Sequence, residues 1–328
     1  MTKRVALTFD DGPDTSVSDV TNKLLDVLRI NNVRATFFCV GKQMEADTRN
    51  TVKAAFDDGH MICNHSWSHA YPINPDWLAI TKDETKLTQE LKQTNVDIQK
   101  ITGAPARIYR APYGELGNFG NNVAKALNML LVGWNNDTND WDENITQDSI
   151  KATIINAQDG SDILMHCTLK DTKNPLKTVN AVKDAIVQLG ANCTYVTVLE
   201  LENPVVPIYE YYADGSDGRR YNYNTANQSV GAGWTRTNSP AFYACASATD
   251  NTKPFYRYHR VDAGGFWYLD YYDTNASRNS WNLDTIWWYG YSQQKAGLLP
   301  VYAERTGINN NIRLTTNSNS KGTLVFYG

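Results

Sequence analysis

Two hydrophobic patterns alternate over the first two-thirds of the chain. Short apolar runs predict strands, and segments in which apolar residues recur every three or four positions predict helices. Strands that alternate with helices form a parallel sheet, and this many units predicts an α/β fold that closes into a barrel or near-barrel. The expected strands cover residues 5–9, 35–40, 60–63, 108–110, 130–134, 163–165 and 195–198.

Local signals mark where two of the expected helices begin and end. Thr81 and Glu84 have the Thr-x-x-Glu spacing of a capping box, which predicts the start of a helix. Gly59 suits the C-terminal cap of a helix that begins near Thr48. Barrel enzymes carry their chemistry at the C-terminal ends of the strands, so the residues that follow each strand are the candidates for a site.

The pattern changes at residues 203–207 (NPVVP), beyond which lie 15 of the 19 Tyr and 5 of the 9 Trp. A Pro-x-Tyr triplet recurs at residues 207–209, 254–256 and 300–302, which predicts three repeats in a smaller all-β domain. We expect a β-trefoil-like arrangement, with a small propeller-like array as the alternative. The expected domains are residues 1–203 and 204–328.

Length and charge limit the classes to which this protein can belong. A chain of 328 residues suits two domains. The formal net charge of −4 argues against a nucleic-acid binder, which normally carries an excess of Lys and Arg. No apolar run approaches the roughly 18–20 residues of a membrane span. The chain opens on Met1 and enters a strand almost at once, without a recognisable signal peptide.

Five cysteines are scattered along the sequence without the spacing of a metal finger. Most of them lie in apolar contexts, where a free cysteine behaves as a small buried hydrophobic residue. We therefore expect no disulfide framework, and the redox compartment stays open.

Two adjacent carboxylates, Asp10 and Asp11, follow the first expected strand and precede Gly12-Pro13. Consecutive strand residues point in opposite directions, so the two groups are suited to different roles. One can bind a metal while the other handles a proton. A polar turn without chemistry is the alternative for this segment alone.

Two histidines, His65 and His69, follow the third expected strand. The i, i+4 spacing places two imidazoles on one side of a helical turn, which suits a zinc ion. Catalytic zinc usually takes three protein ligands, and Asp11 is the candidate for the third. A pair of hydrogen-bonded surface histidines is the alternative, and nearby His60 is expected to be structural.

Three further segments follow later strands, at residues 110–114 (RAPYG), 137–141 (DTNDW) and 164–166 (LMH). With the two earlier segments, in this order, they resemble the motifs of the NodB-homology polysaccharide deacetylases, carbohydrate esterase family 4. The resemblance covers about residues 1–200. It implies a deformed (β/α) barrel and a secreted or cell-envelope hydrolase that removes acetyl groups from carbohydrate.

The resemblance also implies a division of labour among the site residues. Asp11, His65 and His69 resemble the family's metal ligands, for Zn²⁺ or for Co²⁺ or another divalent ion. Asp10 resembles its general base, and Arg110 is expected to pair with Asp10.

The other family positions concern proton donation and substrate contact. His166 resembles the general acid, and Asp137 is expected to orient it and keep it charged. Tyr113 is expected to offer its backbone N–H to the oxyanion, while Trp141 and Leu164 are expected to line the pocket for the acetyl methyl group. The sequence departs from the family pattern at two positions, with Cys167 where Asp is common and Ala111 where Pro is frequent.

The substrate expected from the resemblance is an N-acetylglucosamine polymer or oligomer, of the peptidoglycan or chitin type. Acetylated xylan fits the same motifs and remains the alternative. A catalytically silent sugar-binding protein and a phosphate-ester hydrolase are the rivals from other classes. We expect a monomer without a nucleic-acid partner, and for the second domain either carbohydrate or cell-wall binding or a structural role.

Overall fold

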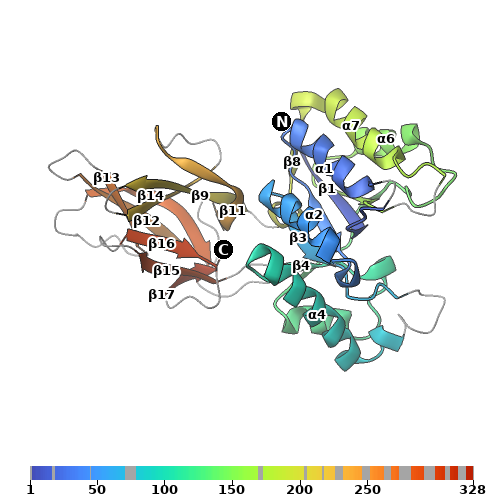
Figure 1. The fold of residues 1–328 in the computed structure, drawn as a ribbon, viewed down its shortest axis with the longest axis horizontal. Coiled ribbons are helices and arrows are strands. Elements are labelled where there is room, and N and C mark those ends of the chain that lie inside the picture. The colour runs from blue at the N-terminus through green and yellow to red at the C-terminus, as the bar shows by residue number, and fades with distance from the viewer. Residues whose placement is uncertain are drawn as a thin grey trace. The chain divides into compact units, whose positions relative to one another are not determined.

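The computed structural model divides into two compact units, Met1–Glu202 and Asn203–Gly328, and each is described by itself (Figure 1). All structural statements concern residues 2–16, 19–44, 46–70, 79–168, 173–202, 205–215, 218–225, 232–245, 252–261, 267–272, 282–291, 300–306, 311–316 and 323–327.

The first unit is built on an eight-stranded sheet in which every strand pair is parallel. The pairing runs β5-β4-β3-β2-β1-β7-β6, with β8 also against β1. The strands are β1 (Lys3–Gly12), β2 (Thr36–Cys39), β3 (Met61–Asn64), β4 (Ile108–Tyr109), β5 (Leu130–Leu131), β6 (Asn136–Asp137), β7 (Ser161–His166) and β8 (Cys193–Val196). The predicted parallel α/β sheet is thus confirmed, as a half-barrel whose path ends at β5 and β6.

Helices flank this sheet (Figure 1). They are α1 (Val20–Ile30), α2 (Ala46–Asp57), α4 (Glu84–Thr102), α5 (Gly120–Ala126), α6 (Gln147–Asn156), α7 (Lys177–Leu189) and α8 (Val198–Glu202), with 3-10 turns η1 (Gly41–Gln43), η2 (Pro112–Gly114) and η3 (Gly190–Asn192). None of the described helices is both long enough and apolar enough to cross a membrane.

The start of α4 differs from the capping box predicted at Thr81. The N-cap is Asp83, whose side chain accepts hydrogen bonds from the backbone N–H groups of Thr85 and Lys86. A carboxylate at this position satisfies two of the unpaired N–H groups of the first turn and also opposes the positive end of the helix dipole.

The two faces of β1 carry different chemistry. Val5, Leu7 and Phe9 are fully buried in the apolar core beneath the helices. The alternate residues Thr8 and Asp10 are also buried, and their side chains point to the opposite face, the inside of the half-barrel. The first strand therefore anchors the core and at the same time delivers polar groups to the interior of the sheet.

The second unit is a nine-stranded sheet whose strand pairs are antiparallel. In each third of the unit, the first strand lies between the second and the third. The strands are β9 (Val205–Gly215), β10 (Gly218–Asn224), β11 (Thr235–Cys245), β12 (Thr252–Val261), β13 (Trp267–Tyr272), β14 (Asn282–Tyr291), β15 (Pro300–Thr306), β16 (Asn311–Thr315) and β17 (Thr323–Tyr327). The Pro-x-Tyr triplets fall in β9, β12 and β15, so the repeat in sequence is a repeat in strand pairing.

Candidate metal centre and active site

Asp11, His65 and His69 converge at the carboxyl-terminal edge of the sheet. Asp11 is the penultimate residue of β1. Residues 65–69, here called the histidine loop, follow β3, and the two histidines lie at the ends of this loop. Asp11 Oδ1 lies 3.2 Å from Nε2 of His65 and 2.9 Å from Nε2 of His69. Each residue offers one ligand atom, and the three ligand atoms lie within 4.8 Å of one another.

The hydrogen bonds behind the two imidazoles leave their inward nitrogens suited to a metal. His65 Nδ1 lies 2.8 Å from the carbonyl oxygen of Arg110. Because a carbonyl only accepts, Nδ1 carries the proton and Nε2 keeps its lone pair. His69 Nδ1 lies 3.2 Å from the hydroxyl of Tyr113, a group that can accept a hydrogen bond from Nδ1–H and so leave Nε2 of the second ring free for a metal.

Asp11 completes a donor set that fits a divalent cation. Its Oδ1 is buried without a well-directed hydrogen bond among the described residues, although both imidazoles are close. Burial favours the neutral carboxyl, but the contacts with His65 and His69 outweigh it and hold the pKa of Asp11 well below its ordinary value. Tetrahedral bonds of about 2.0–2.2 Å to zinc would separate neighbouring ligand atoms by roughly 3.3 to 3.6 Å. The distances from Asp11 Oδ1 to the two imidazole nitrogens, 3.2 and 2.9 Å, are slightly shorter.

Asp10 is held by the buried guanidinium of Arg110. Arg110 Nη1 donates to Asp10 Oδ1 at 2.9 Å and to Thr8 Oγ1 at 2.8 Å. Arg110 Nη2 donates to Asp162 Oδ2 at 2.8 Å. The pairing of Asp10 with Arg110 therefore extends to a second carboxylate that sequence reasoning missed.

Asp162 lies on β7 and is almost fully buried. Burial raises its pKa to about 6, although the charge and hydrogen bonds of Arg110 act in the opposite direction. Thr8 Oγ1 donates to Asp162 Oδ1 at 3.0 Å, which closes a buried network around one cation. Two carboxylates thus share a single guanidinium inside the half-barrel.

His166 is paired with Asp140, which corrects the predicted pairing with Asp137. His166 Nδ1 lies 2.7 Å from Asp140 Oδ1, and the backbone N–H of His166 donates to Asp140 Oδ2 at 2.9 Å. Asp137 instead accepts from the backbone N–H of Asn139 at 2.8 Å. Asn139 has a φ of 51°, and this turn brings the second aspartate of the segment under the histidine.

The buried Asp140 keeps His166 in its charged form. Burial lowers the proton affinity of the ring, but attraction to Asp140 and the hydrogen bond between them raise the pKa of His166 to about 10. Thr178 Oγ1 also donates to Asp140 Oδ2, at 2.7 Å, so the carboxylate is fixed on both sides. With Nδ1 turned to Asp140, Nε2 is the nitrogen from which a proton can be given.

The predicted substrate-contact residues lie in three different settings. Leu164 is buried on β7, two residues before His166, and therefore shares its face of the strand. Trp141 is 58% exposed, directly after Asp140 in the chain. Tyr113 is 41% exposed within η2, and its ring lies against that of His69 with the centroids 4.7 Å apart.

Besides Asn139, four non-glycine residues at or beside the metal ligands have left-handed backbone conformations. They are Asp11 (φ 69°), Ser66 (φ 65°), His69 (φ 44°) and Tyr113 (φ 60°). Such conformations cost free energy and persist only where the surroundings enforce them, which is common at functional sites. Three of the four belong to the metal ligands or to the histidine loop between them.

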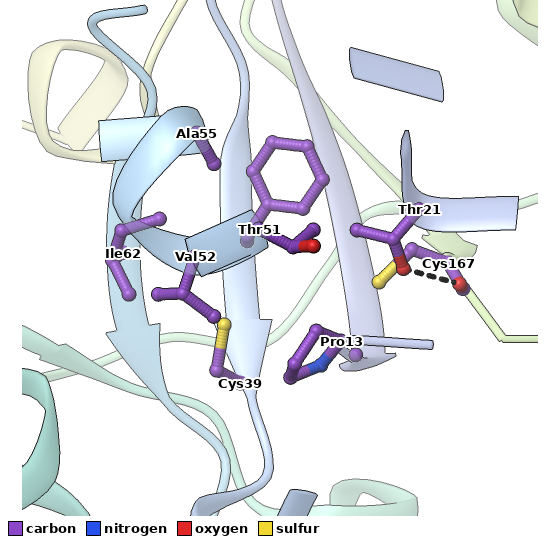
Figure 2. Close-up of a pocket in the computed structure, with 10 residues that line it drawn as sticks. Pro13, Thr21, Cys39, Thr51, Val52, Ala55, Ile62 and Cys167 are labelled. Carbon is purple, nitrogen blue, oxygen red and sulfur yellow. Dashed lines mark hydrogen bonds between the residues drawn. The ribbon is translucent and has the colours of Figure 1, made fainter. Parts of the chain in front are cut away.

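A small pocket lies behind the end of β1, and Figure 2 shows Pro13, Cys39 and Cys167 on its walls. The thiol of Cys167 donates to the carbonyl oxygen of Asp10 at 3.3 Å. A Cβ atom placed on Gly12 would lie only 2.2 Å from Cys167 Sγ. All five cysteines are free and buried, as predicted, and Cys167 packs against the strand that carries the two aspartates.

Comparisons with known proteins agree with this geometry. The family described as "Polysaccharide deacetylase" matches residues 1–132. The peptidoglycan-N-acetylglucosamine deacetylase PgdA of Listeria monocytogenes is 32% identical over 219 residues, 66% of this chain and 42% of that protein. A peptidoglycan-N-acetylglucosamine deacetylase of Bacillus cereus is 36% identical over 165 residues, 50% of this chain and 56% of that protein. The chain thus spans about half the length of these curated relatives.

Solved structures match the first unit over most of their own length. The Bc1960 peptidoglycan N-acetylglucosamine deacetylase is 32% identical, with a TM-score of 0.52, and the match covers 60% of this chain and 87% of that one. A family 4 acetyl xylan esterase from Clostridium thermocellum, solved with a cobalt ion, is 30% identical, with a TM-score of 0.51 and coverage of 61% and 90%.

Proposed function

The chain belongs to the polysaccharide deacetylase family, and from that premise we propose that it is a metal-dependent hydrolase that removes acetyl groups from carbohydrate. The proposed substrate is the N-acetylglucosamine unit of a peptidoglycan- or chitin-type polymer or oligomer. The observation that carries the proposal is the convergence of Asp10, the three candidate metal ligands and the charged His166 at one edge of the sheet. The names of the peptidoglycan deacetylases among its relatives support this substrate class.

Asp11, His65 and His69 would hold the metal, for which we propose Zn²⁺, with Co²⁺ or another divalent ion as a substitute. When bound, such an ion supplies Lewis acidity that acidifies water and polarises a carbonyl group. The chain's own contribution is to present one carboxylate oxygen and two unprotonated imidazole nitrogens. The Arg110 carbonyl and the Tyr113 hydroxyl fix the two rings from behind.

Asp10 is proposed to accept the proton of the attacking water. Arg110 holds one of its oxygens, Oδ1, which leaves Oδ2 for proton transfer, 3.6 Å from His65 Nε2. Because Oδ1 is held, the position of Oδ2 relative to the substrate is also fixed. General acid–base steps of this kind contribute about 10²–10⁴-fold to the rate.

His166 is proposed to donate a proton to the departing amine or hydroxyl. Its pairing with Asp140 keeps Nε2 protonated over the neutral range. The backbone N–H of Tyr113 is proposed to stabilise the developing oxyanion, as preorganised donors do in acyl transfer. Leu164 and Trp141 are proposed to contact the acetyl methyl group.

The second unit is proposed to bind carbohydrate or cell wall and to place the enzyme on its polymer, with residues 1–203 as the catalytic domain and 204–328 as the accessory domain. A trefoil-like threefold plan is supported by the common strand pairing of the three repeats. A polymeric substrate of this class implies a secreted or cell-envelope protein, and we propose that it acts as a monomer.

Acetate release tests the function. The purified protein is stripped with a chelator, resupplied with Zn²⁺ or Co²⁺, and offered chito-oligosaccharide, peptidoglycan and acetylated xylan. We expect metal-restored release from the first two substrates. Release from xylan alone would replace the substrate class with that of an acetylxylan esterase. No release from any of the three by metal-loaded protein would leave a sugar-binding role.

A further inference from the structure

A carboxylate outside the metal triad holds the middle of the histidine loop. Glu90 Oε2 accepts hydrogen bonds from the backbone N–H of Trp67 at 2.9 Å, from the backbone N–H of Ser68 at 2.7 Å and from Ser68 Oγ at 3.0 Å. Hydrogen bonds to an ionised acceptor are about twice as strong as neutral ones. One oxygen atom therefore ties together two of the three residues that lie between the ligands.

Glu90 projects from a well-anchored element. It lies midway along α4, whose Leu87 and Leu91 are fully buried. The same helix is tied to β3, because Asn64 Nδ2 donates to the carbonyl oxygen of Leu91 at 2.9 Å. The carboxylate therefore reaches the loop from a fixed position in the fold.

The carbonyl groups of the loop are held from its other side. The backbone N–H groups of Gly41 and Lys42, in η1, donate to the carbonyl oxygens of Ser66 and Trp67, each at 2.9 Å. A Cβ atom on Gly41 would meet the Trp67 ring at 2.4 Å, so the close approach of η1 depends on glycine. The loop is thus clamped between η1 and Glu90.

The loop needs such a clamp because its backbone is strained at Ser66 and His69. Left-handed conformations of non-glycine residues cost free energy and relax when their surroundings allow it. Relaxation would move both imidazoles, because His65 and His69 flank the segment that Glu90 holds. Ser66 Oγ accepts from the backbone N–H of His69 at 3.1 Å, but that contact is internal to the loop and does not tie it to the fold.

We infer that Glu90 is a positioning residue for the metal centre, whose carboxylate fixes the histidine loop so that Nε2 of His65 and of His69 both face Asp11. The inference rests on the proposed function only in requiring that a divalent ion binds there. Residues that orient metal ligands typically account for 10–100-fold in metal affinity.

The test is a metal titration of the full chain and its variants. Chelator-stripped protein competes with a chromogenic chelator for Zn²⁺, and Co²⁺ absorption reports the geometry of the loaded site. We expect Glu90→Gln to bind Zn²⁺ about tenfold more weakly and Glu90→Ala to approach a hundredfold loss. Glu84→Gln, an exposed carboxylate of the same helix, is the matched control and should bind like the parent.

Separate outcomes decide the inference and the proposed function. Zn²⁺ affinities of the Glu90 variants within twofold of the parent would overturn the positioning role. A lower thermal midpoint of the metal-free variants with unchanged affinity would do the same, because it would mark Glu90 as merely structural. If Glu90→Ala does not fold, Glu90→Gln carries the test alone. A parent that binds neither Zn²⁺ nor Co²⁺ would instead refute the metal centre of the proposed function.

Discussion

Asp10 and His166 are in-register partners on the adjacent parallel strands β1 and β7. The candidate proton acceptor and the candidate proton donor are therefore separated by the spacing of a sheet, not by the placement of a loop. Each is fixed from behind by an ion pair, with Arg110 at Asp10 and Asp140 at His166. The proposed reaction at this edge of the sheet thus depends on two ion pairs, and Arg110 and Asp140 can each be substituted separately.

Replacing Asp140 should shift the alkaline limit of activity. With Asp140 present, the pKa of His166 is raised to about 10, so the donor form persists into alkaline solution. In Asp140→Asn, the carboxylate that most opposes burial is lost and only Asp11 and Asp10 still favour the charged ring, so the pKa of His166 should fall towards its ordinary value of about 6.5. The alkaline limb of a pH–kcat profile should move down by several pH units, and kcat at pH 8 should fall by at least tenfold.

Asp137→Asn is the matched control, since Asp137 is half-buried and accepts a hydrogen bond from the turn at Asn139 rather than from His166. Its profile should overlay that of the parent. A shift with Asp137→Asn and none with Asp140→Asn would restore the pairing first predicted from the sequence.

The buried triad of Asp10, Arg110 and Asp162 predicts that substitutions of its members lower the free energy of unfolding by unequal amounts. Asp162→Asn leaves Arg110 paired with Asp10, so we expect a loss of about 1–3 kcal/mol in the free energy of unfolding. Arg110→Met leaves two buried carboxylates without a cation and should cost about 3–5 kcal/mol. Urea unfolding near pH 7 measures both values. Equal costs, or a larger cost for Asp162→Asn, would contradict this order and mean that Arg110 is not the cation on which both carboxylates depend.

The close approach of Gly12 to Cys167 predicts a compensating pair of substitutions. Gly12→Ala drives a methyl group into Cys167 Sγ and should cost about 1–3 kcal/mol of stability. Cys167→Ala removes that sulfur, so the double variant should be more stable than the sum of the single effects by at least about 1 kcal/mol. A double-mutant cycle of unfolding free energies measures the coupling. Strict additivity would show that the two residues do not oppose each other.

The buried His60 predicts that the first unit becomes less stable towards unfolding in acid. Its Nδ1 accepts from the backbone N–H of Ala35 at 3.1 Å, which requires the unprotonated form. Burial lowers the pKa of His60 to about 4. Between that value and its ordinary value of about 6.5, the unfolded chain binds the extra proton, so stability falls as pH falls through this window, by up to about 3 kcal/mol.

His60→Asn tests this prediction, because an amide oxygen can accept from Ala35 without titrating. The unfolding free energy of this variant should depend less on pH between 6.5 and 4 than that of the parent, as chemical denaturation at several pH values would measure. Parallel curves for the two proteins would assign the acid sensitivity to other groups.

Periodicity predicted the parallel sheet because nearly every strand of the first unit is a short, continuously apolar run. The same two-residue period also predicts the direction in which the Asp162 side chain points. Asp162 precedes Leu164 and His166 at two-residue intervals, so its carboxylate belongs on the same inward face. A charged residue on a buried strand face requires a buried partner, and Arg110 was the available cation.

Other contacts could not be derived from spacing. Asp137 and Asp140 flank the same short turn, and the left-handed conformation of Asn139 decides which of them reaches His166. Glu90 lies in a helix rich in polar residues, and two of its three hydrogen-bond donors are backbone N–H groups, which any residue type would offer. Contacts of this kind depend on tertiary placement, which a one-dimensional pattern does not encode.

The position of β1 has a consequence for the synthesis of the protein. This strand is made before the other strands of the first unit, yet two of its partners, β7 and β8, are the last strands of that unit to be made. Until they emerge, β1 has an unpaired apolar edge, which is the kind of surface that nascent chains bury wrongly or present to other chains. Chains that stop before Cys193 contain every candidate active-site residue but lack the strand that pairs with Lys3–Ala6 of β1, so they should aggregate more readily than chains that include β8.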